Sequence, residues 1–117
     1  MFVSLDDETW SINYEKLASA ITPRTRLILI NNPHNPTGRL YTQEEIDEFA
    51  RFMEKYPDII IISDEVYEEH IYNGTTLARV GSALWDRCIS LFSGGKLFNV
   101  TGWRIGWAVG GASLIQS

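Results

Sequence analysis

The sequence predicts an α/β fold in which a mostly parallel β-sheet is flanked by helices. Helical and extended patterns alternate along the chain, which is the order expected for such a sheet. Short apolar runs such as Ile59 to Ile62 are typical of buried strands, and polar residues, among them Asn, Asp, Pro and Gly, follow these runs. Together these observations indicate one α/β unit.

The first half of the chain is predicted to contain two helices with a strand between them. Asn13 to Ile21 has the spacing of a short amphipathic helix, and Arg26 to Asn31 is predicted to be a buried strand. The second helix begins at a capping box formed by Thr42 and Glu45 and ends before Pro57. Its apolar residues recur at helical spacing and are Ile46, Phe49, Ala50 and Met53.

Three further extended runs complete the predicted sheet. Asp58 to Ile62 is expected to be a buried strand, Cys88 to Phe92 is another extended run, and Ile105 to Val109 is expected to be one more strand. Cys88 is the only cysteine, so it can form no internal disulfide and cannot anchor a metal site built from several thiolates. We expect it to be a small buried hydrophobic residue.

Composition limits the classes of function. The chain of 117 residues is long enough for one core but has no room for a second domain. No apolar stretch approaches the ~20 residues that span a bilayer, so membrane insertion is not expected. A net charge of -5 with scattered basic residues argues against nucleic-acid binding. The first eight residues contain no visible export signal, which leaves a cytoplasmic or a mitochondrial location open.

Three polar residues are predicted to lie at one edge of the sheet. Asn35, Asp64 and Lys96 each fall just beyond the carboxyl end of a predicted strand. Open α/β sheets bind ligands at this edge. Three polar groups that converge there indicate a ligand or active site more strongly than any one motif does.

Three motifs in the same order resemble those of the class I and II aminotransferases, the fold-type I enzymes that use pyridoxal 5'-phosphate (PLP). They are Asn32 to Gly38 (Asn-Pro-His-Asn-Pro-Thr-Gly), Ser63 to Tyr67 (Ser-Asp-Glu-Val-Tyr) and Ser93 to Arg104 around Lys96. The chain is most similar to the branch that contains kynurenine aminotransferase, glutamine transaminase K and cysteine-S-conjugate β-lyase. Ala83 to Arg87 supports this branch, whereas Gly94 departs from the Ser-Ala-Gly-Lys sequence common in it.

The resemblance implies a catalytic group of three residues. Lys96 would form the Schiff base with PLP and move a proton during the reaction. Asp64 would pair with the pyridine nitrogen and keep it protonated, and Tyr67 would place its hydroxyl near the ring oxygen of the cofactor.

Three more cofactor-binding residues follow from the same resemblance. Asn35 would bind the ring oxygen beside Tyr67, and Ser93 and Arg104 would bind the phosphate. The resemblance also implies a cis peptide bond between Asn35 and Pro36. Trp103 and Trp107, which flank Arg104, are expected to be packing residues.

The resemblance further implies that residues 1–117 are part of the PLP-binding large domain, without its N-terminal segment and without the C-terminal small domain. The expected reaction transfers an amino group between an amino acid and a 2-oxo acid. The resemblance implies kynurenine, glutamine or another aromatic or sulfur-containing amino acid as the donor, and the expected full-length assembly is a homodimer. Two alternatives are a cysteine-S-conjugate β-lyase with the same cofactor and a noncatalytic fragment that binds only the cofactor or a partner protein.

Nucleotide hydrolysis and metal binding are less well supported. The apolar run that ends at Asp64 and Glu65 resembles a magnesium-binding strand of nucleotide hydrolases. However, Lys96 does not stand in a phosphate-binding Gly-x-x-x-x-Gly-Lys-[Ser/Thr] loop, and it follows the acidic pair in the chain. His34 and His70 have no second ligand at metal spacing, so they are expected to be loop or surface residues and no metal is predicted.

Overall fold

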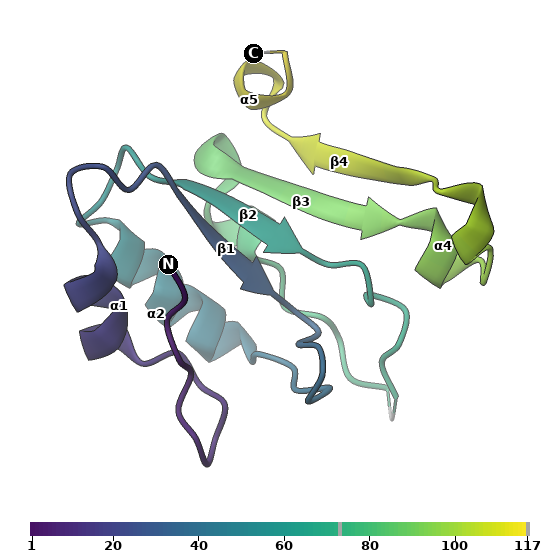
Figure 1. The fold of residues 1–117 in the computed structure, drawn as a ribbon, viewed down its shortest axis with the longest axis horizontal. Coiled ribbons are helices and arrows are strands. Elements are labelled where there is room, and N and C mark those ends of the chain that lie inside the picture. The colour runs from purple at the N-terminus through teal and green to yellow at the C-terminus, as the bar shows by residue number, and fades with distance from the viewer. Residues whose placement is uncertain (73, 117) are drawn as a thin grey trace.

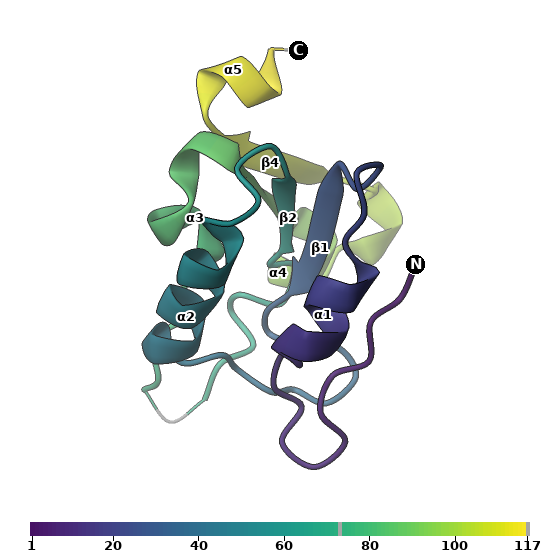
Figure 2. The same ribbon diagram turned by 90° about the vertical axis from the view of Figure 1, so that its left-hand side faces the viewer.

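A four-stranded mixed sheet with helices on one face forms the structure, a computed structural model that describes residues 1–72 and 74–116. Figures 1 and 2 show the sheet with α1, α2 and α3 on the same side of it. The helices are α1 (Tyr14–Ala20), α2 (Gln43–Met53), α3 (Val80–Ala83), α4 (Gly94–Leu97) and α5 (Ala112–Ile115), the strands are β1 (Leu27–Asn31), β2 (Ile60–Asp64), β3 (Cys88–Ser93) and β4 (Gly106–Gly110), and 3-10 turns span Trp85–Arg87 and Thr101–Trp103.

The strand order is β1-β2-β3-β4, and the first three strands are parallel. β4 runs antiparallel to β3, so the sheet is mostly parallel, as predicted, with one reversed edge strand. In the register, Ile30 lies beside Ser63, and Ser63 beside Ser90, whereas Asn31 lies beside Asp64 one position later. Because successive side chains alternate between faces, Asn31 and Asp64 share the face opposite to that of the two serines.

The core lies between the sheet and the helices. α1 and α2 also contact each other, because the rings of Tyr14 and Phe52 are 5.0 Å apart. On the other face of the sheet, Leu27 and Leu29 are 56% and 60% exposed. The structure therefore has one covered and one open sheet face; the buried apolar residues are Leu17, Ile30, Tyr41, Ile46, Phe49, Met53, Ile59, Ile61, Ala78, Val80 and Cys88.

The predicted helices are found with small shifts at their ends. Asn13 is the N-cap of α1 rather than its first residue, and its side chain accepts a hydrogen bond from the Lys16 amide. α2 begins after the predicted capping box, in which the Thr42 hydroxyl accepts from the Glu45 amide and the Glu45 carboxylate accepts from the Thr42 amide. These caps satisfy amides that the first helical turn leaves unpaired.

The strand predicted from Asp58 to Ile62 was placed two residues too early. The Ile59 amide still donates to Tyr56 in the turn after α2, at 3.2 Å, so the ladder starts at Ile60. At its other end, pairing with β1 and β3 keeps Ser63 and Asp64 extended despite their polar side chains. Apolar content alone therefore located the strand but not its ends.

Two predictions about other residues have different outcomes. Trp107 stacks on Phe92, with ring centroids 5.9 Å apart, as expected of a packing residue. Trp103 is 72% exposed, so the prediction that it is a packing residue is wrong for the structure described here. It lies in a 3-10 turn outside the sheet. Among the described residues, no helix has the length and apolar content to cross a bilayer.

Replacement of Thr42 by Ala should destabilise the chain by about 1 kcal/mol, because the variant loses one half of the capping box. The free energy of unfolding can be measured by urea titration. Thr76→Ala is the matched control, since Thr76 is an exposed threonine outside the helices and strands. Equal stability of the two variants would contradict the capping role of Thr42.

Cys88 should alkylate slowly in the folded chain. Burial raises the pKa of its thiol to about 11, and the thiolate is the reactive form. At a pH of about 9, where a free cysteine is largely thiolate, iodoacetamide should label the unfolded chain much faster than the folded chain. Because burial makes the pKa of the thiol higher in the folded chain, the neutral thiol contributes its full stabilisation below the pKa of the unfolded chain. This stabilisation is lost as the pH rises toward about 11. Mass spectrometry with and without urea measures the labelling rates, and equal rates would contradict the buried position.

Candidate active site

Three polar segments meet at the edge where β1, β2 and β3 end. The three strands are parallel, so their carboxyl ends lie along the same edge of the sheet (Figure 1). Asn35 follows β1, Tyr67 follows β2, and Lys96 lies in α4 directly after β3. This edge is the usual ligand-binding position of an open parallel sheet.

Asn31, the last residue of β1, connects two of these segments. Its side-chain oxygen accepts a hydrogen bond from the Asn35 amide at 2.7 Å, and its side-chain nitrogen donates to the Asp64 carbonyl at 2.9 Å. The Asn35–Pro36 peptide bond is cis, as predicted, and the Asn32–Pro33 bond is cis as well. Asn31 therefore fixes the start of the loop that contains Asn35 against the end of β2.

Direct contacts join three of the predicted site residues. The side-chain nitrogen of Asn35 donates to the Tyr67 hydroxyl at 3.4 Å. The ammonium group of Lys96 lies over the Tyr67 ring, 5.4 Å from its centroid. Asn35 and Lys96 are exposed and Tyr67 is half-buried, so the group is open to a ligand.

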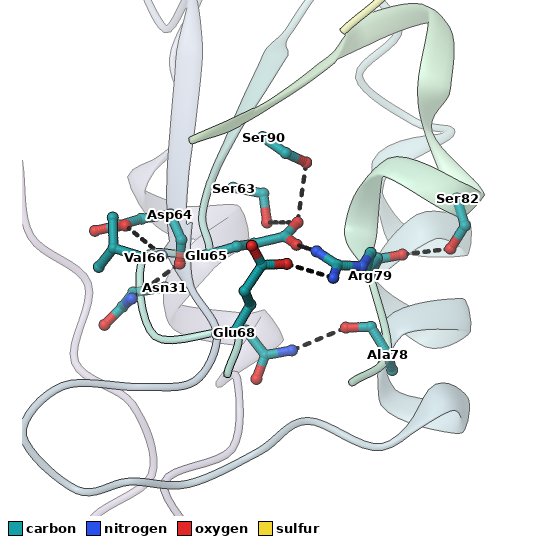
Figure 3. Close-up of polar contacts among 11 residues, drawn as sticks. Asn31, Ser63, Asp64, Glu65, Val66, Glu68, Ala78, Arg79, Ser82 and Ser90 are labelled. Atoms are coloured by element: carbon teal, nitrogen blue, oxygen red, sulfur yellow. Dashed lines mark hydrogen bonds and ion pairs between the residues drawn. The ribbon is translucent and has the colours of Figure 1, made fainter. Parts of the chain in front are cut away.

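Asp64 is the last residue of β2, so the prediction that it lies just beyond the strand is wrong, because pairing with β1 and β3 extends the strand to this residue. Its carboxylate accepts a hydrogen bond from the Val66 amide at 3.3 Å and is half-buried (Figure 3). Since β2 pairs on both sides, the backbone of Asp64 is held in the sheet. Its side chain is thereby fixed on the face that it shares with Asn31. A carboxylate held on a strand is positioned more precisely than one on a free loop.

Ser93 and two glycines position Lys96. The Ser93 hydroxyl accepts from the Lys96 amide at 3.4 Å and caps the short helix α4. Gly95 is buried, and a Cβ added there would come within 3.0 Å of the Thr101 Cα atom, so the close approach of these two segments requires glycine. A Cβ at Gly94 would meet atoms at 3.4 Å or more, which is ordinary van der Waals contact.

Arg104 directly follows the 3-10 turn Thr101–Trp103. Its φ angle is 54°, in the left-handed region, and the next residue, Ile105, accepts a hydrogen bond from the Gly94 amide at 3.0 Å. Its side chain is exposed and forms no ion pair with the residues that the structure describes. The backbones of Ser93 and Arg104 are therefore brought close together, while the guanidinium group stays open to solvent.

Two buried polar residues, Asn32 and Glu65, support the strand ends, and this role was not predicted from the sequence. Asn32 is 1% exposed; its side chain donates to the Ala78 carbonyl and accepts from the Tyr41 amide. Glu65 is equally buried and pairs with Arg79. The only signal in the sequence was the presence of polar residues directly after apolar runs, and this signal does not reveal distant partners.

The two histidines lie in loops, and a cavity lies beside β1. His34 hydrogen-bonds Thr37 and stacks on Trp10, and the ring of His70 meets the edge of Tyr67, so both are loop residues as predicted. A cavity of about 210 Å³ lies between the N-terminal segment and β1. None of Asp64, Tyr67 and Lys96 lines it, and we therefore locate the candidate site at the open strand ends on chemical grounds.

The groups at the strand ends are chemically compatible with PLP. An exposed amine, a fixed carboxylate, a phenol, a hydroxyl and a guanidinium correspond to its aldehyde, pyridine nitrogen, ring oxygen and phosphate. Because Asn35 donates to the Tyr67 oxygen, the phenolic proton is available for another acceptor. The glycines before Lys96 also leave room for close approach of the backbone.

Comparisons with known proteins identify a matching family and several similar proteins. Residues 1–117 match the family model for aminotransferase class I and II. The chain is 44% identical over 109 residues to a kynurenine–oxoglutarate transaminase from Dictyostelium discoideum, covering 91% of this chain and 25% of that protein. It is 42% identical to kynurenine–oxoglutarate transaminase 3 of Rattus norvegicus, covering 92% of this chain and 24% of that protein.

Solved structures give the same result for the fold. The aspartate aminotransferase of Rhizobium meliloti superposes with a TM-score of 0.89 at 31% identity, covering 99% of this chain and 30% of that chain. The N-succinyldiaminopimelate aminotransferase of Mycobacterium tuberculosis superposes with a TM-score of 0.84 at 35% identity, covering 97% of this chain and 30% of that chain. The chain spans about a quarter of the length of the curated relatives it matches. It belongs to the class I and II aminotransferase family.

Proposed function

We propose that residues 1–117 form part of the PLP-binding large domain of an enzyme that transfers an amino group between an amino acid and a 2-oxo acid. The contact chain from Asn35 through Tyr67 to Lys96 is the observation that supports this proposal best. It joins residues from three separate motifs at the strand ends, where Asp64 is the last residue of β2. When bound, PLP would supply an aldehyde carbon and an electron-withdrawing ring to the amino acid substrate.

Lys96 is the proposed catalytic residue. Its Nζ atom would hold the cofactor through the aldehyde carbon and, once displaced by the substrate amine, would take a proton from the substrate Cα atom. The capped helix α4 fixes the backbone of Lys96, while its exposed side chain can reach outward from the sheet edge. A fixed backbone with a free amine suits both duties.

Asp64 and Tyr67 would set the charge and hydrogen bonding of the cofactor ring. The Asp64 carboxylate, held by the Val66 amide, would pair with the protonated pyridine nitrogen. The Tyr67 hydroxyl, which already accepts from Asn35, would donate its own proton to the ring oxygen. A negative charge at one end of the ring and donors at its oxygen favour withdrawal of electrons from the substrate.

Ser93 and Arg104 would bind the phosphate. The Ser93 oxygen accepts from the Lys96 amide, so its proton can be donated to a phosphate oxygen. The exposed guanidinium of Arg104 can form two parallel hydrogen bonds to a phosphate. Both residues flank the segment that contains Lys96, so phosphate binding would also orient the aldehyde toward the lysine.

Kynurenine is the proposed amino donor, since two of the curated relatives are named kynurenine–oxoglutarate transaminases. A 2-oxo acid is the proposed acceptor. We further propose a homodimer as the assembly of the full-length form, on the basis of the family resemblance. Release of ammonia from a cysteine conjugate without amino transfer would instead favour a β-lyase.

Borohydride reduction of the purified chain with PLP should attach the cofactor to Lys96. The chain contains two other lysines, Lys16 and Lys55, both exposed, which serve as internal controls. We expect peptide mapping to find the pyridoxyl group on Lys96 in large excess, because only this amine lies beside Tyr67. Lys96→Arg should lose the label and Lys55→Arg should keep it. Equal labelling of the three lysines, or none on Lys96, would refute the proposed site.

Replacement of Asp64 by Asn should preserve the fold and slow amino transfer. The Asn side chain can still accept from the Val66 amide, but it lacks the charge that would pair with the pyridine nitrogen. We expect conversion of the bound cofactor to its amine form by kynurenine to slow on the order of 100-fold. Absorption spectroscopy follows this half-reaction, and Asp58→Asn, an exposed aspartate before the same strand, is the control. An undiminished rate would contradict the role of Asp64.

A further inference from the structure

A buried charge lies directly beneath the candidate site. Glu65 follows Asp64 in the chain, and its side chain points to the opposite face of the sheet, toward α3 (Figure 3). It is 1% exposed. A buried carboxylate is costly unless it is paired and hydrogen-bonded, so its partners must account for its position.

Every oxygen of this carboxylate has a partner. One oxygen accepts from the Ser63 hydroxyl at 3.0 Å and from the Ser90 hydroxyl at 2.9 Å. The other oxygen pairs with a guanidinium nitrogen of Arg79. Glu65 therefore connects β2, β3 and the N-cap of α3 in one polar cluster.

Arg79 extends the cluster to the turn that contains Tyr67. Its second terminal nitrogen pairs with Glu68 at 2.5 Å, and its guanidinium lies over the Phe92 ring, 5.6 Å from the centroid. Burial lowers the pKa of Arg79, but hydrogen bonds and charge interactions with Glu68 and Glu65 raise it by more than burial lowers it. The net shift of the pKa is therefore upward. Arg79 therefore stays charged and holds both carboxylates.

The cluster fixes the direction of the side chains on either side of Glu65. The Glu65 amide donates to the Leu91 carbonyl at 2.9 Å, and the Glu68 amide donates to the Glu65 carbonyl at 3.0 Å and closes a turn around Tyr67. A shift of β2 by one residue would exchange the faces of Asp64 and Glu65. Such a shift would separate Glu65 from Ser90 and Arg79, whereas Ser63 lies on β2 and would move with it.

We propose that Glu65 and Arg79 are positioning residues: the ion pair between the buried Glu65 carboxylate and the partly exposed Arg79 side chain holds the register of β2 and the turn after it. It thereby keeps Asp64 on the face that it shares with Asn31 and keeps Tyr67 beside Lys96. This inference rests on the proposed function for its meaning in catalysis. The positioning of the turn itself can be measured without any cofactor.

The test uses the purified chain with Glu65→Gln, Arg79→Met and the double variant. Glu65→Gln keeps the shape of the side chain and an oxygen that can accept from the two serines, but it removes the charge that pairs with Arg79. Two controls are matched to it. Glu68→Gln removes the less buried partner of Arg79, and Ile46→Val loosens the apolar core in α2 away from the cluster.

Two readouts separate positioning from stability. The first is hydrogen exchange of the Val66 and Glu68 amides, which report on the turn. We expect Glu65→Gln to speed their exchange by about tenfold beyond Ile46→Val when the two are compared at equal distance below their melting temperatures. The second is the fraction of borohydride-trapped PLP found on Lys96 rather than on Lys16 and Lys55, which should fall in Glu65→Gln and remain high in Glu68→Gln.

The double variant distinguishes a positioning role from a merely structural one. Removal of both charges leaves no unpaired carboxylate at the fully buried position of Glu65, so the melting temperature should recover relative to Arg79→Met. We expect amide exchange to stay faster and the fraction of label on Lys96 to stay lower, because the ion pair that holds the turn is absent. Recovery of both readouts, or a Glu65→Gln variant that behaves like Ile46→Val, would overturn the proposal. If the unaltered chain is not labelled at Lys96, the proposed function fails, and amide exchange alone decides whether the cluster positions the turn.

Discussion

The pairing of Asn31 with Asp64 at the end of the parallel ladder is the constraint on which the candidate site depends. It sets the face on which the carboxylate lies, and the Asn31 side chain bonds both the Asp64 carbonyl and the Asn35 amide. Asn35 in turn contacts Tyr67, and the Tyr67 ring lies beneath Lys96. A single register thus brings together residues from three loops, since parallel strands end at a common edge.

The two acidic residues at the end of β2 have opposite environments. Asp64 is half-buried and faces the open strand ends, whereas Glu65 is enclosed and pairs with Arg79. The alternation of side chains along a strand makes this division possible within two consecutive residues. One carboxylate is thereby free for a ligand, and the other is committed to holding the strand in place.

The apolar core and the site are connected through polar contacts. Buried Asn32 bonds residues 41 and 78, and the Ser90 hydroxyl on β3 bonds Glu65. These contacts join the strand ends to one another and to the loops that precede α2 and α3. The site residues Asn35 and Lys96 are exposed, so their positions depend on such hydrogen bonds and on the glycine contacts before Lys96 rather than on burial of their own side chains.

Features that depend on residues close together in the chain could be predicted from the amino-acid sequence alone. Apolar runs located the strands, the Thr42 and Glu45 capping box located α2, and the three motifs indicated the family. The tertiary structure decided the ends of β2, the antiparallel direction of β4, the bridging role of Asn31 and the pairing of Glu65 with Arg79. These features could not be predicted because each depends on contacts between residues far apart in the chain, and such contacts leave no periodic pattern in the sequence.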